Sequence, residues 1–151
     1  MGTLLEPAEG MAQGNADAQF RARIAALGTA SLETSRLALT KATNPQVKLF
    51  AKFEAAEQEA MGKILKDMGT TVPSTNAEGK ELLANLQKLS GAAFDKNYML
   101  GQVQTHQKLH AAVSAYMNGS SNINVKHITS LALTTITEHT ERGQMILKQL
   151  A

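Results

Sequence analysis

Five ionisable residues stand at positions that the sequence pattern assigns to the inward faces of helices: Glu33, Glu54, Glu57, His106 and His139. In residues 47–68, for example, apolar residues recur at helical spacing, but two glutamates interrupt them. Counted from the predicted turns, the five residues fall at similar heights along their helices. We therefore predict one polar layer in the middle of an otherwise apolar core.

Two interpretations of this layer are open. A buried carboxylate or imidazole needs a partner, because an unpaired buried charge costs several kcal/mol. Pairs of glutamate and histidine from different helices would meet that need without a metal. The same groups could instead bind a divalent ion of Fe, Mn or Zn, since di-iron and di-manganese helical bundles use carboxylate and imidazole ligands. The Glu-x-x-His motif that is usual in those bundles does not occur in this sequence.

Composition excludes several other classes of site. The chain has no cysteine, which rules out disulfides, thiolate metal sites and a cysteine nucleophile. Its formal net charge is +2 and its basic residues are scattered, so we expect no nucleic-acid partner. No stretch is apolar over the length that a membrane span requires. No spacing of serine, histidine and aspartate suggests a catalytic triad, and we assign no catalytic residue.

Four long helices and one short helix must position the polar layer. Apolar residues recur with the helical period throughout, and no segment alternates as a strand does. The predicted helices cover residues 16–42, 45–68, 77–89, 92–117 and 123–150. We predict an all-α protein, an antiparallel four-helix bundle with the short extra helix in the central crossover. The bundle domain would cover residues 17–151 and follow a flexible leader at residues 1–16.

Three stretches of the sequence carry a resemblance to a known family. They are SLETSRLALTKATNPQVKLFAKF from residue 31, LSGAAFDKNYMLGQVQTHQKLH from residue 89, and LALTTITEHTERG from residue 131. They resemble ferritin-like bacterial proteins that are grouped as a domain of unknown function and are often labelled outer-membrane or periplasmic proteins. The resemblance covers residues 17–150.

The resemblance implies an up-down helical bundle and a precursor with a signal peptide. We therefore expect a periplasmic or otherwise exported protein whose signal peptide is encoded upstream of about residue 12. Glu33, His106 and His139 match site positions of the family. The family commonly has Asp-His where this chain has Glu57-Gln58, so the histidine of the second helix does not carry over. Glu54, where the family commonly has methionine, either compensates for that loss or marks a metal-free branch.

The sequence favours a binding or stress-associated accessory role over catalysis. The alternative is a metal-binding protein or a metal-dependent oxidoreductase that uses the polar layer. A protein partner or a homo-oligomer is compatible with both. No cofactor follows with certainty from the residues, and a divalent metal is the candidate that their chemistry allows.

Overall fold

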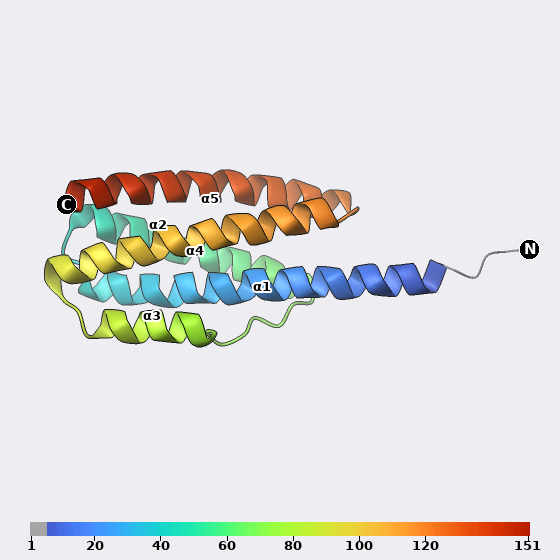
Figure 1. Ribbon diagram of the computed structural model, residues 1–151, viewed down its shortest axis with the longest axis horizontal. Helices are drawn as coiled ribbons and strands as arrows, with labels where there is room; N and C mark the ends of the chain where they lie inside the picture. Colours follow the sequence, from blue (N-terminus) through green and yellow to red (C-terminus); the bar gives the residue numbers. More distant parts are fainter. Residues whose placement is uncertain (1–5) are drawn as a thin grey trace, which may run out of the picture.

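The structure is a computed structural model that describes the backbone of residues 6–151 and the side chains of residues 13–151. Residues 6–151 form five helices and no strand, which confirms the all-helical prediction. The helices are α1 (Glu6–Lys41), α2 (Pro45–Asp67), α3 (Ala77–Gln87), α4 (Gly91–Gly119) and α5 (Ile123–Leu150), shown in Figure 1. Among these described residues, no helix combines the length and apolar character needed to cross a membrane.

The predicted helix boundaries agree with the structure except at the start of α1. That helix begins at Glu6 and not at Ala16. Gly10 and Gly14 each cost such a helix about 1 kcal/mol relative to alanine, and the prediction therefore began the helix after them. Residues 1–5 of the predicted leader lie outside the described residues, and the division of the chain into leader and domain stays a prediction.

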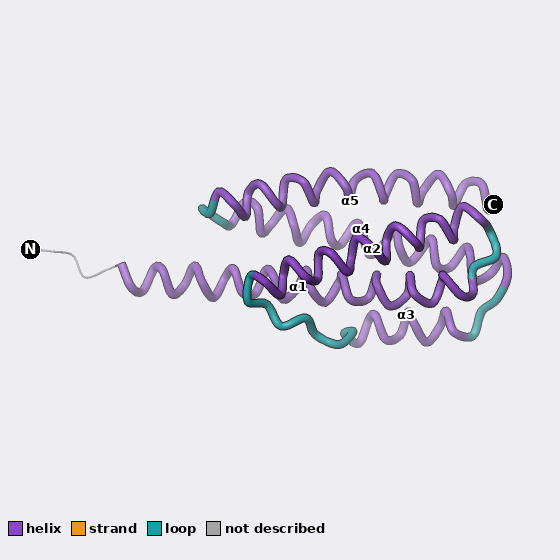
Figure 2. Tube along the Cα trace, turned by 180° about the vertical axis from the view of Figure 1, so that it is seen from behind, coloured by secondary structure: helices purple, strands orange, loops and turns teal. Residues whose placement is uncertain are grey.

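The long helices pack as two antiparallel hairpins. One hairpin is α1 with α2, the other is α4 with α5, and α1 packs against α4 to join them (Figures 1 and 2). The short helix α3 lies along α1 and α4. Close backbone contacts between α2 and α5 are few, so these two helices meet mainly through side chains. The layer residues of α2 and α5 therefore meet across a side-chain interface between the two hairpins.

The turn between α1 and α2 is held by two polar side chains. Asn44 caps α2, because its side-chain oxygen accepts hydrogen bonds from the backbone N–H groups of Gln46 and Val47 at 2.8 and 3.4 Å. Asp95 of α4 accepts from the backbone N–H groups of Thr43 and Asn44 at 3.0 and 2.9 Å, and from the Thr43 hydroxyl at 2.7 Å. A buried carboxylate of α4 thus fixes the turn of the other hairpin.

The apolar core consists of two clusters separated along the helix axes. The first lies toward the α4–α5 turn and includes Ile24, Leu27, Leu65, Leu109, Val113, Tyr116, Val125, Ala132 and Ile136. The second lies toward the α1–α2 turn and includes Ala38, Val47, Phe50, Ala51, Leu86, Phe94, Tyr98, Met99 and Ile146. On every long helix the two clusters are separated by roughly three to four turns, for example between Met99 and Leu109 on α4 and between Ala51 and Leu65 on α2. Most buried polar residues of the long helices, including Glu54, His106 and His139, lie in that gap.

Candidate metal centre

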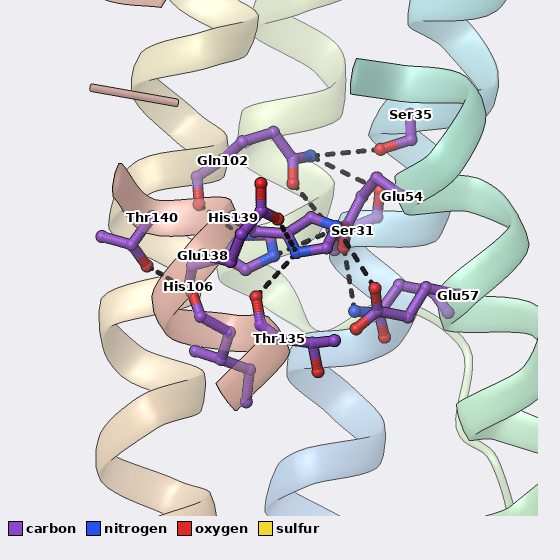
Figure 3. Close-up of polar contacts among 12 residues, drawn as sticks. Ser31, Ser35, Glu54, Glu57, Gln102, His106, Thr135, Glu138, His139 and Thr140 are labelled. Atoms are coloured by element: carbon purple, nitrogen blue, oxygen red, sulfur yellow. Dashed lines mark hydrogen bonds and ion pairs between the residues drawn. The ribbon is translucent and has the colours of Figure 1, made fainter. Parts of the chain in front are cut away.

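Four of the five predicted residues converge between the helices. Glu54 and Glu57 come from α2, His106 from α4 and His139 from α5 (Figure 3). The Nε2 atom of His106 lies 3.1 Å from Glu54 Oε2. The Nε2 atom of His139 lies 3.5 Å from the same oxygen and 3.2 Å from Glu57 Oε2. Carboxylates of one hairpin therefore face imidazoles of the other.

Glu33 is the predicted residue that the structure does not bring to this cluster. Its half-buried carboxylate accepts a hydrogen bond from the hydroxyl of Thr75, in the loop before α3. Side chains two residues apart on a helix point in different directions. The residue of α1 that faces the cluster is Ser31, two residues before Glu33. Glu33 thus holds the crossover loop in place.

Glu54 is fully buried and its two oxygens have different partners. Oε1 accepts hydrogen bonds from the Ser31 hydroxyl at 2.6 Å and from the Gln58 amide at 2.8 Å, while Oε2 faces the histidines. Burial alone raises the pKa of Glu54, but the charge of His106, its hydrogen bond and that of Ser31 together outweigh burial. The pKa falls to about 2, so Glu54 is a carboxylate at neutral pH.

His106 has a partner for each ring nitrogen. Nδ1 lies 2.7 Å from the backbone carbonyl oxygen of Gln102, which can only accept, so Nδ1 carries the hydrogen. Nε2 lies 3.1 Å from Glu54. Burial lowers the pKa of His106. The charge and hydrogen bond of the neighbouring Glu54 carboxylate raise it by more than burial lowers it, so the pKa of His106 lies above its ordinary value. Glu54 and His106 therefore form a buried pair of a carboxylate and an imidazole.

His139 differs from His106 at its Nε2 atom. Its Nδ1 donates to the backbone carbonyl oxygen of Thr135 at 2.7 Å. Among the residues that the structure describes, no hydrogen-bond partner satisfies Nε2, although the side chain is buried. The atom points toward the carboxylates of Glu54 and Glu57. A histidine held at Nδ1 by a carbonyl, with Nε2 free beside carboxylates, has the arrangement of a metal ligand.

Aromatic packing fixes the orientation of both imidazoles. The rings of His106 and His139 are parallel, with an interplanar angle of 1° and centroids 5.5 Å apart. Phe50, one turn before Glu54 on α2, contacts both rings edge-on at centroid distances of 6.2 and 5.7 Å. The two Nε2 atoms are therefore held on the same side, toward α2.

The separations between the ligand atoms suit one ion. The candidate atoms of Glu54, Glu57 and His139 all lie within 4.8 Å of one another. An ion bound tetrahedrally at about 2.0–2.2 Å would separate its ligands by about 3.3–3.6 Å. The measured distances from His139 Nε2 to the two carboxylates, 3.5 and 3.2 Å, are close to that range. Three protein ligands would leave a further coordination position open.

Glu57 is the exposed edge of the cluster. Its side chain is 27% exposed, whereas those of Glu54 and His139 are 0% and 6% exposed. Burial raises the pKa of Glu57, and the charge of Glu54 raises it too, although His139 acts in the opposite direction. A cation beside Glu57 would remove the cost of holding two carboxylates next to each other.

Three uncharged residues around Glu54 and His106 were not predicted: Ser31, Gln58 and Gln102. The amide of Gln102 also donates to Thr34 at 2.9 Å, and Ser35 shares a 2.7 Å hydrogen bond with Tyr98 (Figure 3 shows the Gln102 and Ser35 side chains). The four-residue spacing of polar residues on α1 and α4 was a sequence signal for polar helix faces. Ser31 and Ser35 are four residues apart, as are Gln102 and His106, so each pair shares a helix face.

Comparison with known proteins gives one family match. The model of a family described as Domain of unknown function (DUF4142) matches residues 4–146. Searches of curated proteins and of solved structures give no match. The family match agrees with the resemblance to a domain of unknown function noted in the sequence.

Proposed function

We propose that this chain, which belongs to the DUF4142 family, is a divalent-metal-binding protein whose ion is held by Glu54, Glu57 and His139. The observation that supports this most is the buried Nε2 atom of His139. It faces two carboxylates and, within the described part of the chain, lacks a hydrogen-bond partner. An ion of Mn²⁺, Fe²⁺ or Zn²⁺ would take the lone pair of this nitrogen.

Charge balance supports the same proposal. Two carboxylates beside one neutral imidazole compensate the charge of a divalent ion. Without the ion, the negative charge of Glu54 is shared between His106 and the Ser31 and Gln58 hydrogen bonds, whereas Glu57 has the His139 imidazole at 3.2 Å as its ion-pair partner. Buried charges are stable only when they are paired or coordinate metals.

The binding role favoured from the sequence is compatible with this site. We propose metal binding in an exported accessory protein, and we propose a ferritin-like four-helix bundle as its architecture. The two antiparallel hairpins support the bundle, and the sequence resemblance supports export. Fractionation of cells that express the full-length gene tests the location. Recovery of the protein with the cytosolic fraction would contradict export.

Thermal unfolding of tag-free, chelator-treated protein tests metal binding. Adding Mn²⁺, Zn²⁺ or, under anaerobic conditions, Fe²⁺ should raise the melting temperature, because a ligand that binds only the native state stabilises it by mass action. At an ion concentration 100 times the dissociation constant, the stabilisation is about 2.7 kcal/mol. Calorimetric titration should give one ion per chain.

A matched pair of histidine variants supplies the control. His139→Ala should abolish the rise in melting temperature, whereas His127→Ala, an exposed histidine of the same helix, should keep it. If none of the three ions stabilises the unaltered protein, the metal-free layer is the correct interpretation. If His139→Ala keeps the full rise, the ion binds elsewhere.

A further inference from the structure

An apolar pocket in the first core cluster ends at the candidate metal centre. It has a volume of about 40 Å³ and is lined by residues of all four long helices, α1, α2, α4 and α5. Glu57 and Gln58 stand at its end nearest the centre. Its other walls are almost entirely apolar and include Ile24, Leu65, Val113, Ala132 and Ile136.

The pocket meets the centre on its exposed side. Glu57 is both a lining residue of the pocket and the most exposed of the three candidate ligands. Glu54 is closed off by Ser31, Gln58 and His106. The open coordination position of an ion held by the three ligands is therefore reached past Glu57.

Size and chemistry restrict what this pocket can admit. A volume of about 40 Å³ exceeds the roughly 10–15 Å³ that one water molecule needs, and it is well below the roughly 150 Å³ of an apolar cavity that binds benzene. Apolar walls give water too few hydrogen-bond partners, and apolar cavities in proteins bind apolar guests such as xenon. A charged ligand would lose its hydration without compensation.

We propose that the pocket admits a small, uncharged, apolar molecule of about the size of dioxygen to the open position of the metal ion. This inference rests on the proposed function, because the molecule needs the ion as its partner. Along this route, the apolar walls would disfavour anions and the small volume would disfavour bulky ligands.

Xenon is a suitable probe, since it is apolar, uncharged and small. Xenon-129 dissolved with the Zn²⁺-loaded protein should shift the methyl resonances of Ala132, Ile136 and Leu65. In the Mn²⁺-loaded protein, xenon relaxation should rise well above that with Zn²⁺, because the paramagnetic ion lies at the end of the pocket. The absence of methyl shifts would overturn the inference. So would the absence of enhanced xenon relaxation in a Mn²⁺-loaded sample.

Filling the pocket supplies the matched control. Ala132→Phe should remove the xenon shifts and lower the relaxation to the Zn²⁺ level while Mn²⁺ still binds. Leu131→Phe, at an exposed neighbouring position, should change neither. Ala132→Leu is the milder filling variant if the phenylalanine prevents folding. Xenon signals that survive a filled pocket would overturn the pocket inference and leave the proposed function standing. Failure of the unaltered protein to bind Mn²⁺ would overturn both.

Discussion

At the scale of single residues, the orientation of Glu54 depends on an uncharged neighbour. The Ser31 hydroxyl lies 2.6 Å from Oε1 and the Gln58 amide 2.8 Å from the same oxygen. Because these donors hold Oε1, Oε2 is left to face the histidines. Partners that orient a ligand in this way commonly affect metal affinity 10- to 100-fold when they are removed, on the order of 1.4–2.7 kcal/mol.

Ser31→Ala should therefore weaken metal binding about 10-fold or more, measured by calorimetric titration. Ser35→Ala is the control, because this buried hydroxyl of the same helix bonds to Tyr98 and not to Glu54. Both variants should lose some folding stability, but only Ser31→Ala should lose affinity. Equal affinity in the two variants would show that Ser31 has a structural role alone.

The sequence identified the charged residues of the centre better than their uncharged neighbours. Glu54, Glu57 and His139 were predictable because a charged residue within an apolar stripe is rare and needs a partner. Ser31 was not, because serine is common on both exposed and buried helix faces. Glu33 was placed in the layer because small residues surround it, and its actual partner, Thr75, lies in a loop whose path the helical pattern does not define.

At the scale of elements, the two hairpins are joined by Asp95 as well as by apolar packing. The helix ends were predictable from caps such as Asn44 and Asn122, whose side chains accept the first free N–H groups of α2 and α5. The contact between Asp95 and the α1–α2 turn was not, because it joins residues far apart in the sequence. Helix boundaries depend on residues that are neighbours in the sequence, whereas the packing of hairpins depends on residues that are far apart in it.

Asp95→Ala should lower the free energy of unfolding by about 3 kcal/mol, because it removes the charged acceptor of two backbone N–H groups and one hydroxyl at a partly buried turn. For a chain of this length, that corresponds to a fall of about 6–12 °C in melting temperature. Asp95→Asn, which keeps one side-chain acceptor, should lose less. Asp67→Ala, at an exposed ion pair with Lys63, should have almost no effect. Urea unfolding measures the stability of all three variants. If the free energy of unfolding of Asp95→Ala equals that of the unaltered protein, this contact does not stabilise the fold.

At the scale of the whole molecule, the polar layer makes stability depend on pH. The lowered pKa of Glu54 means that its contribution is complete above its ordinary value of 4.5 and is lost as pH falls toward about 2. The raised pKa of His106 acts in the opposite sense. Its contribution is complete below its ordinary value of 6.5 and is lost as pH rises through the folded value. The raised pKa of Glu57 also lowers stability as pH rises, beginning at its ordinary value of 4.5 and ending above its folded value.

The metal-free protein should therefore be most stable at mildly acidic pH, between the ordinary values of 4.5 and 6.5. Urea unfolding across a pH series measures this. His106→Gln should remove much of the decline toward alkaline pH, whereas His127→Gln, an exposed position, should keep it. A stability profile of the unaltered protein that rises steadily from pH 5 to pH 9 would contradict the charge assignment of the layer.

The placement of the three candidate ligands on both hairpins has a consequence for the covalent topology of the chain. An ion bound by Glu57 of α2 and His139 of α5 would cross-link two points between which α3 and α4 lie. Closing so long a loop restricts the unfolded chain, and a disulfide in that position would contribute about 4–5 kcal/mol by this effect. The chain has no cysteine. Its metal centre would be a cross-link that forms without oxidation and that a chelator opens.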